Sequence, residues 1–159
     1  MMDRLKILVD GGGHGYSIAL FPKNERYYNY QKGATNNEAE YNGVILALEK
    51  LPEDSKAIIL TDSQLIVGQL TQGWNINYDH LYEKTRKIES LIDKKNLDVE
   101  FKWFPREKNT ADLVLRKHLI KIGVEVKEPL YEKVKRLEKE NKQLTDEIKR
   151  LKDASQKDA

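Results

Sequence analysis

The segment that decides this fold spans residues 35–41 and has the sequence TNNEAEY. Thr and Asn side chains accept hydrogen bonds from the unpaired backbone N–H groups of a first helical turn, so the segment predicts a helix start. Glu40 follows Asn37 at the i+3 spacing of a capping box. Apolar residues then recur at helical spacing from Glu38 to Leu51, and Pro52 ends the pattern. The sequence therefore predicts an amphipathic helix in this region.

Short β-like runs lie on the N-terminal side of this helix. Leu5–Val9 is apolar and ends at Asp10, glycines dominate residues 11–15, and two further runs cover Tyr16–Phe21 and Arg26–Lys32. Turn-forming residues separate the runs so closely that neighbouring runs are expected to pair as hairpins. This part of the chain therefore predicts an antiparallel meander.

Strands and helices alternate after the predicted helix. Ala57–Leu60 is short and wholly apolar, which is typical of a parallel strand buried on both faces. Further helices are expected over Ser63–Leu70, over Tyr78–Asp93 and from Asn109 to about Ile122, with a strand over Asp98–Phe104. The order β-β-β-α-β-α-α-β-α predicts an α/β fold in which helices cover the faces of a mixed sheet.

The composition limits the possible functions. The chain has 159 residues, enough for one domain with a sizeable core, and its 28 Lys and Arg nearly balance 26 Asp and Glu. Any contact with nucleic acid would therefore come from local patches of charge. The absence of cysteine excludes disulfides, cysteine-ligated zinc and thiol catalysis, and no apolar run reaches the roughly 18–20 residues that span a bilayer. We expect a soluble protein of the cytoplasm that does not enter a membrane.

A heptad pattern follows Pro129. Its positions are spaced alternately by four and three residues, and they would form a seam about 33 Å long on a helix. In a parallel pair of such helices Lys133 would face Glu138 of the second copy, and Asn141 would meet its own copy, which favours two strands in register. The seam consists of Leu130, Val134, Leu137, Asn141, Leu144, Ile148 and Leu151.

This change in composition predicts two parts of the chain. Residues 1–126 would form the globular domain, and residues 127–159 a coiled-coil helix that joins two copies in a parallel homodimer. The last residues, from Asp153 onward, are expected to form a frayed tail. The alternative is a long charged helix that stands alone or lies on the globular domain.

Four acidic residues stand where a strand ends or a helix begins: Asp10, Glu40, Asp62 and Asp112. Each has a structural alternative, as a turn residue for Asp10, an N-cap for Asp62 and capping-box partners for the other two. If the strands that end at Asp10 and Asp62 are adjacent and parallel, all four side chains can meet at one sheet edge. Four carboxylates without matching Lys or Arg would repel one another, and bound divalent cations relieve that repulsion. Mg²⁺ suits an all-oxygen set, and two ions about 4 Å apart are typical of phosphodiester cleavage.

Together these motifs resemble those of type 1 ribonuclease H. They are DGG from Asp10, TNNEAEY from Thr35, TDSQ from Thr61 and NTADL from Asn109, in the family's order over about residues 3–120. The resemblance implies a five-stranded sheet of order 3-2-1-4-5 and endonucleolytic hydrolysis of the RNA strand of RNA–DNA hybrids, with 5′-phosphate ends. It also implies that two Mg²⁺ or Mn²⁺ ions, one activating a water and one stabilising the leaving 3′ oxygen, are held by the catalytic residues Asp10, Glu40, Asp62 and Asp112.

The resemblance also implies substrate contacts. Glu40 would hydrogen-bond a ribose 2′-OH, the group that distinguishes RNA from DNA. Asn37 and Gln64 would contact the minor groove of the hybrid, and Thr35 a phosphate of the DNA strand. The simpler alternatives are an N-cap for Asn37 and a solvated helix residue for Gln64. The expected substrate-binding set is Gly11, Thr35, Asn36, Asn37 and Gln64.

Some features depart from the family pattern. The hairpin turn at residues 11–15 is short, and its His14 either touches substrate or is simply exposed. Residues 103–108 hold no histidine, so product release would fall to Glu107 or Lys108 or would be slow. A basic extra helix is missing after Leu70. Contacts that hold the substrate could come instead from Trp74, Lys84, Arg86 and Lys87. The last three of these residues also suit a solvated charged face.

The sequence thus predicts a metal-dependent hybrid ribonuclease that dimerises through its C-terminal helix. Two alternatives stay open. A nuclease on the same scaffold could act on DNA junctions or other duplexes, since a fold does not fix a function. A non-catalytic dimer could instead bind nucleic acid and present a coiled coil, although the intact acidic set disfavours that interpretation.

Overall fold

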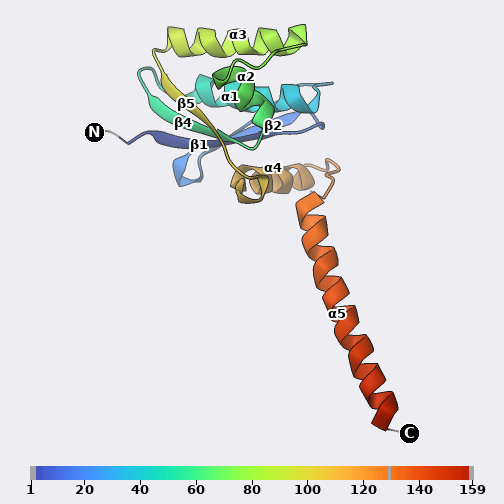
Figure 1. The fold of residues 1–159 in the computed structure, drawn as a ribbon. Helices are drawn as coiled ribbons and strands as arrows, with labels where there is room; N and C mark the ends of the chain where they lie inside the picture. The colour runs from blue at the N-terminus through green and yellow to red at the C-terminus, as the bar shows by residue number, and fades with distance from the viewer. Residues whose placement is uncertain (1–2, 129, 158–159) are drawn as a thin grey trace. The chain divides into compact units, whose positions relative to one another are not determined.

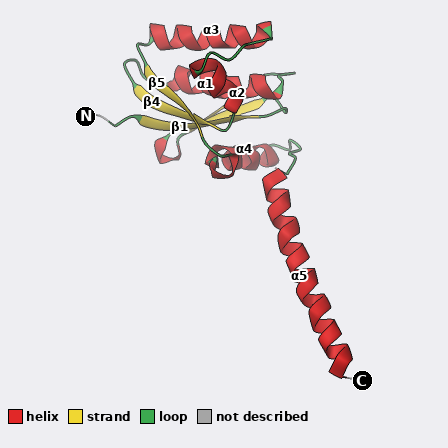
Figure 2. Ribbon diagram, viewed as in Figure 1, coloured by secondary structure: helices red, strands yellow, loops and turns green. Residues whose placement is uncertain are grey.

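Five strands form a mixed sheet in the order β3-β2-β1-β4-β5 (Figures 1 and 2). β1 runs antiparallel to β2 and β2 antiparallel to β3, whereas β4 lies parallel to both β1 and β5. This arrangement confirms the predicted α/β fold and strand order. The structure is a computed structural model in which residues 3–128 and 130–157 are described. The strands are β1 (Leu5–Gly11), β2 (Tyr16–Leu20), β3 (Arg26–Tyr30), β4 (Lys56–Thr61) and β5 (Asp98–Trp103).

Helices cover both faces of the sheet (Figure 1). On one face α1 packs against β1 and β2, and α3 packs on α1; on the other face α4 packs against the same two strands. The short α2 follows β4 and contacts β4 and β5. These helices, whose ends lie within two residues of the predicted ones, are α1 (Asn36–Lys50), α2 (Gln64–Thr71), α3 (Asp79–Lys94) and α4 (Thr110–Lys121), and short 3₁₀ turns cover Pro22–Asn24 and Arg106–Lys108.

The first turn of α1 is capped differently from the prediction. Thr35 is the N-cap: its hydroxyl oxygen accepts the Glu38 N–H at 3.2 Å, and the Glu38 carboxylate accepts the Thr35 N–H at 2.8 Å. The capping box is therefore Thr35 with Glu38, and the alternative pairing of Asn37 with Glu40 is wrong. The extended backbone that an N-cap requires falls at Thr35, so the box falls two residues earlier than predicted. Glu40 is left for another role.

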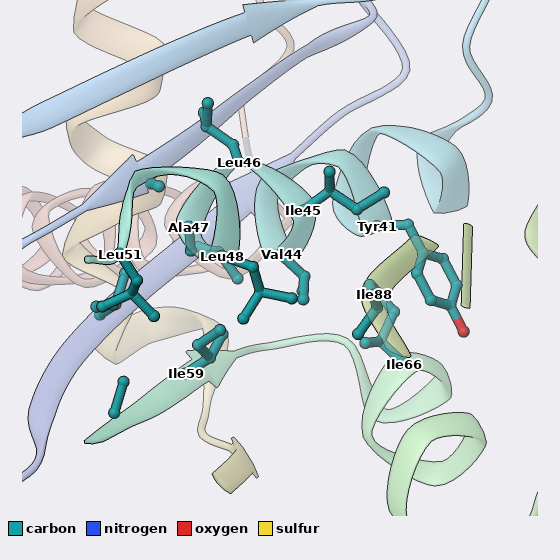
Figure 3. Close-up of a cluster of buried hydrophobic side chains, with 14 of the residues drawn as sticks. Tyr41, Val44, Ile45, Leu46, Ala47, Leu48, Leu51, Ile59, Ile66 and Ile88 are labelled. Carbon is teal, nitrogen blue, oxygen red and sulfur yellow. The ribbon is translucent and has the colours of Figure 1, made fainter. Parts of the chain in front are cut away.

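The core lies between α1 and the sheet (Figure 3). Figure 3 shows Val44, Leu48 and Leu51 of α1 directed toward Ile59 of β4, and all four are buried. Tyr41 is also fully buried, and its hydroxyl donates to the Gln69 side-chain oxygen at 2.5 Å. Burial of each large apolar side chain stabilises the fold by about 1.5–3 kcal/mol. This packing fixes α1 against the strands whose carboxyl ends carry the candidate site.

The chain divides into two compact units, Met1–Glu125 and Val126–Ala159. The second contains a long helix, α5 (Leu130–Lys157). The Arg136 guanidinium of this helix bonds to the carboxylate of Glu128, which precedes the helix, and to that of Glu140, at 3.1 Å each. Helix extends through residues 153–157, within the predicted tail, and the fraying of these residues stays a prediction. Those residues include no Gly or Pro, and Lys157 complements the dipole of the last turn. Residues 158–159 lie outside the described part, as does Pro129, where the change in composition was placed.

The six apolar seam positions of α5 are all exposed, from 44% for Val134 to 76% for Leu130. Asn141 is exposed as well.

Among the described residues, no helix is both long enough and apolar enough to cross a membrane.

Candidate active site at the acidic edge of the sheet

The parallel pairing of β1 and β4 brings Asp10 and Asp62 to the same edge. Leu8 lies opposite Leu60 in this pair. Continuing the register by two residues places Asp10 beside Asp62, where the two strands reach their carboxyl ends. In α/β sheets this edge is the usual place for a binding site.

Gly11 lets the first turns of α1 approach the end of β1. A Cβ atom at Gly11 would lie 2.3 Å from the backbone carbonyl of Ala39 and 2.6 Å from the Glu40 nitrogen, so no larger residue fits there. Gly43 lies similarly close to the backbone of Asp10, since its Cβ would be 3.1 Å from the Asp10 carbonyl oxygen. Glu40 is thereby placed next to Asp10. The sequence assigned Gly11 to substrate binding, and the structure gives it this packing role.

Three carboxylates converge as a result. Asp10, Glu40 and Asp62 each offer an oxygen, and these three oxygens lie within 4.8 Å of one another. We call this group the acidic cluster. Asp10 is buried, and the other two are partly buried. Because the members come from β1, α1 and the end of β4, the fold itself and no local motif assembles the cluster.

Asp112 lies beside the acidic cluster but has cationic neighbours. It is 3% exposed, and its carboxylate lies 3.8 Å from the Arg106 guanidinium and 3.5 Å from that of Arg116. Its charge and its hydrogen bond to Asp10 raise the pKa of Asp10. The expectation that no Arg or Lys accompanies the four acids is therefore wrong. Arg116 lies four residues after Asp112 on α4, and this i, i+4 spacing of opposite charges is visible in the sequence.

Asn109 ties three parts of the site together. Its side-chain oxygen accepts the Ala111 N–H at 3.1 Å, which confirms it as the N-cap of α4. Its side-chain NH₂ donates to the Val9 carbonyl at 3.2 Å and to the Asp62 carboxylate at 3.1 Å. One buried amide thus joins the end of β1, the start of α4 and an acid of the cluster. The capping role could be predicted, but its bond to Asp62 could not.

The structural alternative of Asp62 as an N-cap is wrong. Ser63, and not Asp62, caps α2: the Ser63 hydroxyl oxygen accepts the Ile66 N–H at 3.3 Å. The hydroxyl proton of Ser63 is donated to Glu40. Ser63 therefore starts a helix and holds a cluster carboxylate at the same time, while the Asp62 carboxylate remains in the cluster.

Burial and like charge make ionisation of the acidic cluster costly. Burial raises the pKa of Asp10 well above its usual range, and the charges of Asp62, Asp112 and Glu40 raise it further. Burial also raises the pKa of Glu40 to about 7, with Ser63 acting in the opposite direction. The pKa of Asp62 is raised by burial, against the lowering effect of the Asn109 hydrogen bond. A nearby cation would reverse these shifts.

The donor set fits a hard divalent cation. All three members of the acidic cluster are carboxylates, and their oxygens are close enough to one another to bind the same ion. The Asn109 amide donates a hydrogen bond to Asp62 and the Ser63 hydroxyl donates one to Glu40, which orients these two carboxylates. Oxygen-only ligands favour Mg²⁺, Mn²⁺ or Ca²⁺ over zinc or copper. Asp112 hydrogen-bonds to Asp10 but is not among the three residues whose oxygens lie within 4.8 Å of one another.

The predicted substrate contacts lie around this edge in different settings. Asn36 and Thr35 are exposed at the start of α1, with the Thr35 hydroxyl oxygen engaged in the cap, and Asn37 is partly buried. Gln64 is exposed and lines an open depression of about 610 Å³ together with Asp62, Trp103 and Arg106.

The residues predicted to grip substrate are dispersed. Trp74 is 46% exposed and packs on Gly68, where a Cβ would be 2.1 Å from its ring. Lys84 is held in a structural network, donating to Gln31 at 3.0 Å and to Asn42 at 2.7 Å. Lys87 pairs with Glu49 and Arg86 is exposed.

Comparison with known proteins adds independent evidence. The model of the RNase H family matches residues 7–114. A ribonuclease H of Chromobacterium violaceum is 29% identical over 119 residues, covering 64% of this chain and 81% of that protein. A bifunctional protein of Mycobacterium tuberculosis is 32% identical over 79 residues, covering 48% of this chain but 21% of that protein. The chain thus spans about a fifth of the length of its mycobacterial relatives.

Solved structures show the same fold. LC11-RNase H1, isolated from compost by a metagenomic approach, is 30% identical with a TM-score of 0.61, and the match covers 71% of this chain and 93% of that one. The structure of LC11-RNase H1 in complex with an RNA/DNA hybrid matches at 28% identity and a TM-score of 0.60, covering 67% and 88%.

Proposed function

The chain belongs to the RNase H family, and from that premise we propose that it hydrolyses the RNA strand of RNA–DNA hybrids. The observation that carries the proposal is the acidic cluster, whose three carboxylates come from distant parts of the chain and lie within 4.8 Å of one another. A purely structural role does not explain it, because the capping duties near the cluster belong to Thr35, Ser63 and Asn109. The hybrid substrate is supported by the relatives named ribonuclease H and by the hybrid-bound LC11-RNase H1.

The acidic cluster and Asp112 would hold two Mg²⁺ or Mn²⁺ ions. Such ions, when bound, activate a water for in-line attack and stabilise the leaving 3′ oxygen, which gives 5′-phosphate ends. The protein's part is to keep the carboxylates in place. Asn109 orients Asp62 through its amide, and Ser63 holds Glu40 through its hydroxyl. Glu40 would also contact the ribose 2′-OH, Asn37 and Gln64 would contact the minor groove, and Thr35 a phosphate of the DNA strand.

Asp62→Asn tests the proposal. The full chain should cleave a labelled hybrid in Mg²⁺ or Mn²⁺ and lose activity in EDTA. The Asn variant should lose at least about 10³-fold in kcat, because metal-held charge stabilisation is worth several kcal/mol. Asp93→Asn, a matched change at an exposed position of α3, should cleave as the wild type does. Equal activity of the Asp62 variant and wild type would refute the assignment. Parallel assays on double-stranded RNA, duplex DNA and a DNA junction would expose a nuclease with a different substrate.

We further propose that α5 joins two copies in a parallel coiled coil. Its leucines are exposed along one seam, which leaves an apolar stripe for a partner helix. Charge supports a second copy, since Lys133 would face Glu138 and Glu147 would face Lys152 in a parallel pair. An antiparallel pair would set Asn141 against leucine, so the parallel arrangement is favoured.

Sedimentation of the full chain tests this second proposal. Leu137→Gln with Leu144→Gln should convert a dimer to a monomer, whereas Lys139→Gln with Asp146→Gln, on the outer face of the heptads, should not. If the wild type sediments as a monomer at high micromolar concentration, the homodimer is refuted. Two linked sites would raise the effective concentration on a long hybrid, so the monomeric variant should bind long hybrids more weakly at unchanged cleavage per site. We also propose that the protein acts in the cytoplasm.

A further inference from the structure

His14 lies in the short turn between β1 and β2, at the edge that carries the acidic cluster. Its ring is partly buried and not simply exposed, and the Asp112 carboxylate is close enough to act on its pKa. Neither the caps nor the carboxylate network described above uses this side chain. Its position in the site therefore calls for a role of its own.

The ring of His14 has a fixed orientation. Its Nδ1 accepts the backbone N–H of Tyr16 at 3.1 Å, so the proton of the neutral ring is on Nε2. The ring packs against Tyr16 with 5.9 Å between centroids, and Tyr16 packs in turn against Tyr30 at 4.6 Å. Burial lowers the pKa of His14, which keeps the ring neutral near pH 7. The side chain thus presents one N–H donor.

Glycines hold that donor beside the site. A Cβ at Gly12 would be 2.7 Å from the His14 Nε2, so this atom lies directly over the backbone two residues beyond Asp10. Gly15 has a positive φ of 86°, and a Cβ there would be 2.5 Å from the Gln31 carbonyl oxygen. The Gly15 N–H donates to the Gly12 carbonyl at 2.9 Å. The His14 ring therefore lies over a tightly closed turn.

We propose that His14 binds substrate, its Nε2–H donating a hydrogen bond to a phosphate oxygen of the RNA strand next to the acidic cluster. This rests on the proposed function and adds a contact to it. The geometry suits the task because a phosphate approaching the acidic cluster needs hydrogen-bond donors at its rim. Residues 103–108 offer no histidine that could serve instead.

His14→Asn tests this role. The Asn side-chain oxygen can still accept the Tyr16 N–H, but the variant lacks the distal N–H donor. The dissociation constant for a short hybrid, measured by fluorescence anisotropy in EDTA, should rise about tenfold, because the variant loses one hydrogen bond to a charged group. KM in Mg²⁺ should rise similarly, with kcat changed less than about twofold. His80→Asn, a matched change at an exposed position on α3, should leave the dissociation constant and KM unaltered.

A second variant separates binding from folding. The longer side chain of His14→Gln reaches toward the Nε2 position and should recover part of the lost affinity, even if the Tyr16 bond is weakened. Wild-type affinity and KM in His14→Asn would overturn the inference, as would a fall in kcat alone. If wild-type protein fails to cleave any hybrid, the proposed function itself fails. If it cleaves and His14→Asn binds normally, only the role of His14 fails.

Discussion

The two ends of the parallel strands treat charge in opposite ways. At the amino ends, opposite charges and dipoles are matched within the chain: Arg4 bonds to the carboxylates of Asp98 at 2.8 Å and Glu100 at 3.2 Å. The Lys95 ammonium donates to the Leu48 and Glu49 carbonyls at the end of α1, at 2.9 and 2.8 Å. At this end of the sheet these charged groups are thus paired with partners in the same chain.

At the carboxyl ends, like charges are gathered. The acidic cluster places three carboxylates within 4.8 Å, and burial raises the pKa of each member. Nothing in the stability of the fold requires this arrangement, because the helix caps nearby are supplied by other residues. The difference indicates that the amino ends hold the fold together, while the carboxyl ends gather carboxylates whose repulsion a bound cation would relieve. Changes at the two ends should therefore have different kinds of effect.

The largest expected effect is on catalysis at the carboxyl ends. Glu40→Gln removes one member of the acidic cluster and should lower kcat by at least about 10³-fold in a hybrid-cleavage assay. Glu38→Gln alters the same first turns of α1 by the same chemistry, and it should cleave normally because that carboxylate serves only the capping box. Similar losses in both variants would mean that the helix start, and not the cluster, is what matters.

The next effect is on the pH dependence of stability. Burial raises the pKa of Glu40 from 4.5 to about 7. The folded metal-free protein therefore keeps a proton that the unfolded chain releases. This contribution is fully present below pH 4.5 and is lost as the pH rises through 7. Urea unfolding should show a loss of about 3 kcal/mol between pH 5 and pH 8.

Two controls sharpen that result. Glu40→Gln should flatten the pH dependence, and Mg²⁺ at pH 8 should restore stability to the wild type, since a bound cation favours the ionised carboxylates. Stability that rises from pH 5 to pH 8 in the metal-free wild type would contradict the electrostatic account of the carboxyl ends.

The third effect tests the amino ends. Lys95→Met keeps most of the aliphatic side chain but removes the ammonium group that binds the last carbonyls of α1. The free energy of unfolding should fall by about 1.5 kcal/mol, the usual contribution of hydrogen bonds to a charged group, with kcat and KM unchanged. A loss of cleavage activity without a loss of stability would show that this end is not merely structural.

The sequence predicted the strands and helices because hydrophobic periodicity and turn residues are local signals, whereas the strand order came from the resemblance of its motifs to type 1 ribonuclease H. It also singled out the acids that the structure brings together, through their places at strand ends and helix starts. What it could not predict depends on distances between segments. Three such contacts join residues that are remote in the chain or lie on adjacent turns. They are the close contact at Gly11, the Asn109 amide on Asp62 and the guanidinium groups beside Asp112.

The errors in capping have a simple cause. The segment of residues 35–41 offers several overlapping cap patterns, with Thr35 and Glu38 at the same spacing as Asn37 and Glu40. Spacing alone cannot choose between them, because the choice is made where the backbone enters α1 against the end of β1. The heptad pattern of α5, by contrast, is purely local, so the sequence could predict that helix. The partner of the helix depends on a second chain, and its pairing remains our proposal.

The smallest expected effect concerns the ion pairs of Arg4. Arg4→Met removes its bonds to Asp98 and Glu100, but these groups are solvent-accessible, so water and salt already screen the attraction. The melting temperature should fall by less than it does in Lys95→Met, and the difference from wild type should shrink further in about 0.5 M NaCl because the Debye length shortens. Thermal unfolding at low and high salt measures both. Cleavage should be unaffected, since the pairs lie at the opposite end of the strands from the acidic cluster. A salt-independent loss as large as that of Lys95→Met would show that Arg4 acts through packing of its side chain and not through charge.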